Sequence, residues 1–551
     1  MAEIRRTPGV YVTEKTAFPP SIVGVPTAVP GFIGYTQKAD VSGKPVFLEP
    51  IKIGSLADYQ SIFGGEYDPL YTITPVTASG EIQAHKFDFK VSDPEDNGDI
   101  KYYRLGVPPA PPPTPQFNLY NSMRLFYANG GGNCFVVSVA PYLNPPEDGK
   151  PPTPNTVSKD ALIAGLKAIQ DQVGPTMLVV PEAVLLPAAT VTSNPFKDVV
   201  RAMLDQCELM QDRFAILDVY GTQTVVSQAT LDEVIQKFRT DVDGSPLNRG
   251  AAYFPFVNST VVPISDYDYT NISPIVDATP PNNSLTKILT WENANLYNGG
   301  VVPTDPTKGT PRYEAVKADI ELMKDTTLTP VQITKVNQNL LAALPLLGDM
   351  LNVIAYQNDV LPSSGAMAGV YTRVDQASGV WNAPANVTLN AVAKSTYKLN
   401  DAQQGDLNLP VDGKAIDALR EFTGRGTVVW GARTLDGNSN DYRYIQVRRT
   451  LIYIEQSIKS ALNQFVFAPN DTNTWVAVVA MCSAFLQGLW QQGGLMGASQ
   501  NEAFGVECGI GSTMTPQDVL NGYMIVQVTL QMIRPAEFIE LIFKQKMEGV
   551  A

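Results

Sequence analysis

Few residues in this chain of 551 amino acids could carry out acid–base, nucleophilic or metal chemistry. It contains one histidine, His85, and four cysteines. Ser-His-Asp and Cys-His nucleophilic sites, two-histidine zinc sites and facial-triad iron sites all require imidazole. Each of them would have to use His85, so the composition excludes most hydrolases and most metal enzymes. We expect no metal site.

The cysteines show neither a C-x-x-C pair nor the short spacing of a zinc ribbon or a disulfide framework. This pattern predicts buried free thiols in a protein made in a reducing compartment. The amino terminus has no apolar run typical of a secretory signal, and the longest apolar run, 475–486, is shorter than a membrane span needs. We therefore expect a soluble protein assembled in the cytoplasm. The cysteines are Cys134, Cys207, Cys482 and Cys508.

The sequence also lacks a phosphate-binding loop. Its best near-match, Gly424-Arg-Gly-Thr-Val-Val-Trp-Gly431, lacks the third glycine, and residues 427–430 have the pattern of a strand where the dinucleotide fingerprint needs a helix. No G-x-x-x-x-G-K-[ST] occurs. The 40 basic and 54 acidic residues leave a net charge of −14, which disfavours nucleic-acid binding by the whole surface. We expect no cofactor and no nucleic-acid partner.

Residues 160–260 alternate between helical segments and apolar runs of strand length. This alternation is typical of βαβ units and predicts an α/β domain built on a mostly parallel sheet. The expected helices cover 160–172, 195–211 and 230–239, and the expected strands cover 177–180, 214–220 and 251–257.

Downstream, the pattern predicts helices at 312–324 and 330–357. The second has an apolar stripe at three- and four-residue steps, and we expect it to pack in a core because its polar face has almost no Lys or Arg for a membrane surface. Two proline clusters, 107–115 and 144–154, are interpreted as loop borders. A ligand for a proline-recognition domain is the alternative.

The last 200 residues predict an α+β domain in which two helices pack on a sheet. We expect Asp471 or Thr472 to cap the second helix and Gly493 to follow its end. The helices should cover 449–467 and 472–492, and the strands 442–447, 503–507, 523–533 and 538–543.

Both chain ends carry a short strand pattern. An isolated strand exposes backbone amides and carbonyls, which an existing sheet edge satisfies, either within the same molecule or in a neighbouring one. Pairing within the molecule and exchange between subunits both remain open from the residues alone. The strand residues are Val10, Tyr11, Val12 and Thr13 at one end and Phe538, Ile539, Leu541 and Phe543 at the other.

Several segments, taken in their order along the chain, resemble the contractile tail sheath family of bacteriophages, R-type bacteriocins and extracellular contractile injection systems. They are Thr7-Pro-Gly-Val-Tyr-Val-Thr-Glu14, Pro30-Gly-Phe-Ile-Gly-Tyr35, residues 207–218, 361–371, 379–386 and 424–434, Tyr444-Ile-Gln-Val-Arg-Arg449, Phe467-Ala-Pro-Asn470, Thr474-Trp475 and Pro535-Ala-Glu-Phe-Ile539.

The resemblance implies a structural protein without enzymatic activity. Sheaths of this family stack as six-fold rings around an inner tube, and their contraction drives the tube through a cell envelope. Their chain-end arms pair with sheets of neighbouring subunits. The implied partners are other sheath subunits, sheath paralogues, the inner tube protein, and baseplate and tail terminator proteins, with no direct membrane insertion. The implied location is a phage tail or tail-like particle that is released from the cell.

The expected architecture is multidomain, combining α/β and α+β parts, with the α+β core near the tube and two insertions on the outer side. We predict an N-terminal arm at 1–30, an α/β middle domain at 31–64 and 118–264, insertions at 65–117 and 265–350, a sheath core at 351–533 and a C-terminal arm at 534–551.

Residues 414–449 are net basic in an acidic chain, with seven basic and four acidic residues. We expect part of this segment to contact the inner tube or an acidic neighbour through screened ion pairs that release on contraction. A solvated face with internal partners, such as Asp417 and Arg420 on one helix, is the alternative. The predicted contact residues are Lys414, Arg420, Arg425, Arg443, Arg448 and Arg449.

Two other classes of function compete with a sheath subunit. A monomeric adhesin or toxin carried by a similar particle would stay discrete in solution, whereas a sheath subunit should polymerise. An α/β enzyme would need a convergent catalytic site, which one histidine and no glycine fingerprint disfavour.

Overall fold

A computed structural model describes residues 21–106, 117–145, 152–276, 284–305 and 308–541. The chain divides into two units, each with its own core. The larger unit comprises residues 28–377 and 383–445, and the smaller unit comprises residues 1–27, 378–382 and 446–551. The predicted core domain of 351–533 is therefore spread over both units.

The larger unit is built on a nine-stranded sheet with the order β15-β18-β17-β11-β10-β9-β1-β8-β4. The six strands from β17 to β8 run parallel, as the alternating pattern predicts. These are β1 (Pro30–Thr36), β8 (Cys134–Pro141), β9 (Met177–Val179), β10 (Phe214–Asp218), β11 (Gly250–Phe254) and β17 (Asp417–Phe422), with antiparallel β4 (Ile51–Ile53), β15 (Val387–Thr388) and β18 (Gly426–Val429).

Helices cover both faces of this sheet, because alternate side chains of its buried strands enter opposite cores. Phe32 of β1 lies in one core and Ile33 in the other. The Ile33 face packs on α4 (Lys159–Gln170), α5 (Pro195–Met210) and α6 (Gln228–Asp241), and the Phe32 face on α1 (Leu56–Phe63), α3 (Leu119–Ala128) and α11 (Ser364–Ser378).

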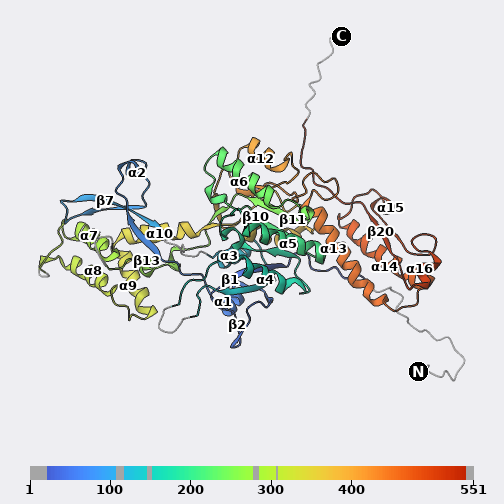
Figure 1. The fold of residues 1–551 in the computed structure, drawn as a ribbon, viewed down its shortest axis with the longest axis horizontal. Coiled ribbons are helices and arrows are strands. Elements are labelled where there is room, and N and C mark those ends of the chain that lie inside the picture. The colour runs from blue at the N-terminus through green and yellow to red at the C-terminus, as the bar shows by residue number, and fades with distance from the viewer. Residues whose placement is uncertain (1–20, 107–116, 146–151, 277–283, 306–307, 542–551) are drawn as a thin grey trace, which may run out of the picture. The chain divides into compact units, whose positions relative to one another are not determined.

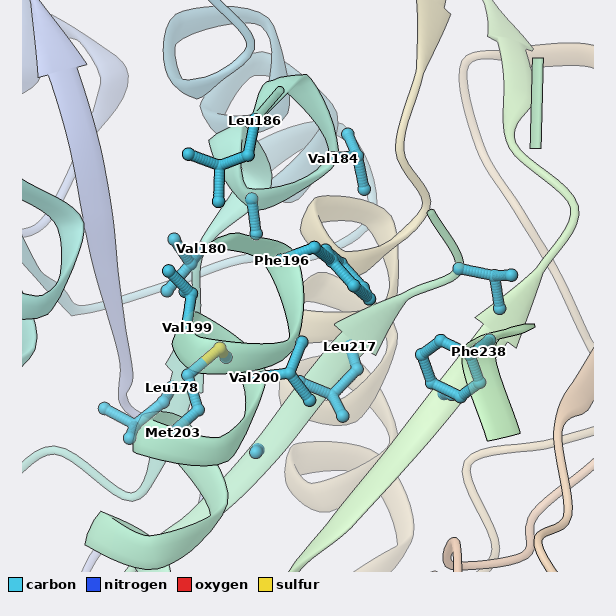
Figure 2. Packing of buried hydrophobic residues seen from close by; sticks show 14 of the residues in the cluster. Leu178, Val180, Val184, Leu186, Phe196, Val199, Val200, Met203, Leu217 and Phe238 are labelled. Atoms are coloured by element: carbon cyan, nitrogen blue, oxygen red, sulfur yellow. The ribbon is translucent and has the colours of Figure 1, made fainter. Parts of the chain in front are cut away.

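Figure 2 shows the Ile33 face where α5 meets the sheet. Val199 and Met203 of α5 lie beside Leu178 of β9, and Val200 lies beside Leu217 of β10. Full burial of such a side chain contributes about 1.5–3 kcal/mol, so this layer supplies much of the stability of the larger unit.

A lobe of the larger unit brings together segments that lie far apart in the sequence. Its four-stranded sheet, in the order β13-β5-β7-β6, shares one core with four helices, and β7, β13 and the helices lie together in Figure 1. The two predicted insertions thus form one body. It contains β5 (Tyr71–Pro75), α2 (Ser79–Gln83), β6 (Phe89–Asp93), β7 (Asp99–Gly106), β13 (Ile272–Ser273), α7 (Leu285–Tyr297), α8 (Pro311–Leu322), α9 (Pro330–Ala343) and α10 (Pro345–Asn358).

The single helix predicted at 330–357 is wrong, because the chain bends by 114° between α9 and α10. Pro345 has no amide hydrogen to continue α9, and Leu344 before it has the extended ψ of 98° that proline favours. The predicted core packing is confirmed, since Leu340, Leu347 and Leu351 are all buried in the lobe.

Smaller elements complete the larger unit. A three-stranded sheet has the order β14-β12-β16, and β2 pairs with β3. These elements, with one further helix, are β2 (Asp40–Val41), β3 (Lys44–Pro45), β12 (Val257–Ser259), β14 (Val360–Leu361), β16 (Val392–Ser395) and α12 (Asp401–Asn408).

The smaller unit confirms the prediction of two helices packed on a sheet. Figure 1 shows α13, α14 and β20 together, and Ile454, Val478 and Phe504 share its core. Asp471 caps α14 through a 3.0 Å bond from the Thr474 amide. The elements are α13 (Ile445–Leu462), α14 (Thr472–Gln491), α15 (Gln500–Ala503), β19 (Phe504–Glu507), α16 (Pro516–Leu520) and β20 (Gln527–Leu530).

Two strand predictions in this region are wrong. Residues 442–447 do not form a strand, because α13 begins at Ile445 and the β-pairing of Tyr444 with Arg433 is an isolated bridge. The strand predicted at 523–533 is shorter and covers Gln527–Leu530. Both segments alternate in polarity over a length at which helix and strand patterns overlap.

Among the described residues, α14 is the one continuous helix long and apolar enough to cross a membrane. One face of it, with Met481, Leu486 and Leu489, packs in the core of the smaller unit.

Candidate functional site

The only histidine occupies an exposed turn. His85 follows α2 with a φ of 53°, and its ring meets Phe87 edge-on at a centroid distance of 6.0 Å. Within the described ranges, no group of three or more His, Cys, Asp and Glu residues is placed to hold a metal ion. The described residues around His85 therefore do not form a metal site with its imidazole.

The cysteines are free thiols, and three of them are buried as predicted. Burial raises the pKa of Cys134 and Cys207 to about 12 and that of Cys482 to about 11. The half-buried Cys508 also has a raised pKa because of burial. Since the thiolate is the nucleophile, none of these groups is activated at neutral pH.

The described chain leading from the predicted N-terminal arm is anchored to α13. The Val25 amide donates to Ser457 Oγ at 3.1 Å, and the Arg449 guanidinium donates to the Thr27 carbonyl at 3.1 Å. Gly24 lies so close to the Tyr453 ring that an added Cβ would overlap the phenol. The arm residues Val10, Tyr11, Val12 and Thr13 themselves lie outside the described residues.

The predicted C-terminal arm strand has no pairing within the described chain. Phe538, Ile539 and Leu541 expose 71%, 79% and 75% of their surface, and residues 533–541 form no strand. Phe543 lies outside the described residues. Three of the four residues in 538–541 thus expose large apolar side chains to solvent. This exposure is unfavourable in free energy unless another surface covers them.

A potential acceptor for an added strand lies in the smaller unit. β19 and β20 form a two-stranded antiparallel sheet, so in the described residues each strand has one unpaired edge. Beside β20 runs a groove of about 480 Å³, lined by mostly apolar residues of α13, with Glu455 and Lys459 among them, and by Val528 and Leu530. An extended chain added here would gain main-chain hydrogen bonds and cover apolar surface.

The predicted basic contact residues mostly have internal partners. Lys414 pairs with Asp243 at 2.9 Å, and Arg420 pairs with Asp401 at 2.8 Å. Asp417 and Arg420 belong to β17, so the helix proposed for them is wrong.

The remaining four cations lie at different depths. Arg443 is half-buried and donates to the Ser439 carbonyl. Arg448 and Arg449 are only 4% exposed, and Arg448 faces Glu455 at 3.5 Å. Arg425 alone among the six is exposed, with a bond to the Asn386 carbonyl. Contact with a tube stays a prediction, and Arg425 is the residue best placed for it.

Sequence reasoning missed the residues that anchor the arm and line the groove. Ser457, Tyr453 and Gly24 carry no motif of their own, and only the helical spacing of Ser457 and Tyr453 from Arg449 places them on one face of α13.

Comparison with known proteins identifies the smaller unit first. Residues 438–546 match the model of the phage tail sheath C-terminal domain. The tail sheath protein of Burkholderia phage BcepMu is 29% identical over 141 residues, which cover 25% of this chain and 29% of that protein. The match thus spans under a third of the length of the curated relative.

Solved structures extend the likeness to almost the whole chain. The sheath of the PVC extracellular contractile injection system in its contracted state has a TM-score of 0.55 and 25% identity, covering 99% of both chains. The C-terminal part of the chain therefore matches a phage tail sheath domain, and the chain as a whole resembles contractile sheath proteins. The contracted helical sheath of the anti-feeding prophage is equally similar, with a TM-score of 0.55 and 25% identity over 98% of this chain and 100% of that one.

The mixed α/β multidomain architecture is that of sheath proteins from contractile injection systems. The similar proteins are components of a phage tail and of contractile injection systems.

Proposed function

We propose that the chain polymerises as six-fold stacked rings around an inner tube and contracts to drive this tube through a target cell envelope. The observation that carries the proposal is the likeness over 99% of the chain to a contractile sheath. The unpaired edges of β19 and β20 and the exposed segment 538–541 support it, because they are the two halves of a strand exchange.

Electron microscopy of the purified chain tests this function. A sheath subunit should form hollow tubes or stacked rings, whereas a monomeric adhesin, toxin or enzyme should stay discrete. Deleting residues 1–15 should abolish the polymer and leave a folded monomer, because the predicted arm strand lies within the deletion. Polymer that persists after this deletion would count against the arm model.

Within this function, the arm strands Val10–Thr13 and 538–543 bind the β19–β20 sheet and the groove of a neighbouring subunit. Val528→Lys should block assembly, because it places a charge inside the apolar groove. Gln527→Lys is the matched control, since Gln527 is the exposed neighbour on the same strand. Equal assembly of both variants, with unchanged circular dichroism, would reject the groove as the arm acceptor.

The basic segment then contacts the inner tube or a neighbour through Arg425, supported by its exposure. Arg425→Glu should weaken tube-bound assembly at least severalfold at 0.05 M salt and less at 0.5 M, because salt screens exposed ion pairs. Arg201→Glu on the exposed face of α5 is the control, since in the described structure the ion pair of Arg201 is with Asp205 on its own helix. If both variants assemble on the tube equally well, this contact is excluded.

The remaining partners follow from the same function. They are sheath paralogues, the baseplate and a tail terminator, and the particle is assembled in a bacterial cytoplasm and released from it. The similar structures include the baseplate of the anti-feeding prophage, at 24% identity and a TM-score of 0.54. Copurification of the chain with baseplate proteins from the producing cell tests these associations.

A further inference from the structure

The nine-stranded sheet contains a topological switch point between β1 and β9. From β1 the chain crosses by α3 to β8 on one side, and from β8 it crosses by α4 on the opposite face to β9 on the other side. In open α/β sheets, ligands bind at such a point, outside the carboxyl ends of the strands. A helix N-terminus commonly faces the ligand there.

In this protein the side chain of Glu182 lies at the switch point, where other α/β proteins bind a ligand. Glu182 follows β9 within three residues and has no exposed surface. Its Oε1 accepts a 2.9 Å hydrogen bond from the amide of Leu119, the first residue of α3. Beside it, the Asn118 side-chain amide donates to the Pro181 carbonyl at 3.1 Å. The second carboxyl oxygen, Oε2, is buried without a side-chain hydrogen bond in the described structure.

The opposite wall is shaped to fit this carboxyl group. Gly34 near the end of β1 faces Glu182, and a Cβ on Gly34 would overlap both of its carboxyl oxygens. Gly34 has no positive φ, so glycine is required here for space and not for backbone conformation. This accounts for the second glycine of Pro30-Gly-Phe-Ile-Gly-Tyr35.

We propose that Glu182 acts as a built-in ligand: its carboxyl group fills the switch-point crevice and ties the N-terminus of α3 to the carboxyl ends of β1 and β9. The crevice that binds small molecules in other α/β proteins is thereby used to hold two layers together. The same arrangement recurs at α11, where the Ser364 amide donates to the buried Asp218 at 2.9 Å, and at α10, where the Leu346 amide donates to Glu292 at 2.9 Å.

The surroundings favour a carboxyl group that is mostly neutral. Burial raises the pKa of Glu182 to about 8, although nearby backbone amides, that of Leu119 first, oppose this shift. The ionisable groups that face it are Tyr35 of β1, Tyr59 of α1 and Tyr142 after β8, and burial raises the pKa of each of them. No cation is among these facing groups, so the clamp does not depend on an ion pair.

A mutant cycle between Gly34 and Glu182 in the full chain tests the proposal. Gly34→Ala should lower the melting temperature in the wild-type background, because the new methyl group displaces the carboxyl. In the Glu182→Ala background the same change should lower it by less than half as much. Additive shifts would overturn the proposal, because they would mean that Gly34 and Glu182 do not share the crevice.

Hydrogen exchange at Leu119 supplies an independent measurement. Glu182→Ala should accelerate exchange of this amide roughly tenfold, the size of one lost buried hydrogen bond, whereas Glu182→Gln keeps an acceptor oxygen and should retain the protection. Glu233→Ala, an exposed glutamate of α6, is the control. Unchanged protection in Glu182→Ala, or equal loss in Glu182→Gln, would overturn the clamp.

If Glu182→Ala folds too poorly for exchange, sodium acetate provides a further test. At pH 5, where part of the acetate is present as the neutral acid, 0.2 M acetate should raise the melting temperature of this variant more than sodium chloride does, because the neutral acid can refill the vacated position. An equal rise in the Glu233→Ala control would count against a ligand-like crevice.

Discussion

Individual buried residues decide the chemistry that this protein can and cannot perform. Groups that serve as nucleophiles or acids elsewhere are here neutralised by burial, as the raised pKa values of Cys134, Cys207 and Glu182 indicate. Their hydrogen-bonding capacity is used for packing.

The free energy of unfolding should depend on pH through Glu182. Its pKa is about 8 in the folded chain against an ordinary value of 4.5, so between about pH 4.5 and 8 the unfolded chain loses this proton and the folded chain keeps it. Stability contributed by the neutral group is thus complete below pH 4.5 and declines as pH rises to 8, by at most about 1.4 kcal/mol per pH unit.

Urea unfolding of wild type and Glu182→Gln at pH 5, 6.5 and 8 measures this effect. The glutamine variant should gain stability relative to wild type as the pH rises, because it cannot ionise. Glu233→Gln serves as the exposed control. Parallel pH profiles of wild type and Glu182→Gln would contradict the raised pKa.

Thiol reactivity should separate Cys508 from the other cysteines. Cys508 is half-buried, whereas Cys134, Cys207 and Cys482 are buried. In the native chain a thiol reagent at pH 8 should modify Cys508 at least tenfold faster than the others, and all four should react alike in guanidinium chloride. Mass spectrometry of tryptic peptides locates the label, and early labelling of Cys207 would contradict the buried α5–sheet contact.

At the scale of elements, close approach between helices and the sheet sets the larger unit. Gly165 of α4 lies against β1 and β8, where a Cβ would come within 2.5 Å of Ile33 and 2.6 Å of Val139 side-chain atoms. Gly405 of α12 has no atom within 4 Å of such a Cβ. Both glycines lower helix propensity by the same amount, but the space around Gly165 is filled and the space around Gly405 is open.

Alanine at the two positions should therefore have opposite effects. Gly165→Ala should destabilise the chain by about 1–3 kcal/mol through overpacking. Gly405→Ala should be neutral or stabilise by up to about 1 kcal/mol through helix propensity. Chemical denaturation measures both, and a stabilising Gly165→Ala would show that α4 does not pack this closely.

At the scale of the whole molecule, charge opposes the assembly of identical copies. Each chain carries a net charge of −14, and most of the basic residues in 414–449 have internal partners. Copies therefore approach each other against like-charge repulsion. Contacts between copies in the proposed sheath must then rely mainly on apolar surface and backbone pairing.

Self-assembly without the tube should consequently strengthen with salt. Raising sodium chloride from 0.02 to 0.5 M should lower the protein concentration needed for polymer severalfold, because screening weakens the repulsion. Sedimentation across this series provides the measurement. Dissolution of the polymer at high salt would indicate that ion pairs between copies dominate.

The sequence predicted well those features that depend on local pattern. Period-2 and period-3.6 hydrophobicity placed α4, α5, β9 and β10, and the N-cap at Asp471 followed from local hydrogen-bonding chemistry. The motifs, taken in their order along the chain, indicated a resemblance to the tail sheath family. Each motif is short, but a chance match to all of them in the same order is improbable.

Tertiary structure alone decided which distant segments meet. Nothing in residues 71–106 or 261–358 indicated that they share one core, and no local signal shows that Glu182 lies beside Gly34 and Leu119. Arg448 and Arg449 have the sequence pattern of surface cations, but in the folded chain both are buried. Arg449 donates a hydrogen bond to the Thr27 carbonyl. The sequence pattern shows the periodicity of a single helix or strand. The burial of a side chain, its pKa and its hydrogen-bond partners depend on surfaces that only folding brings together.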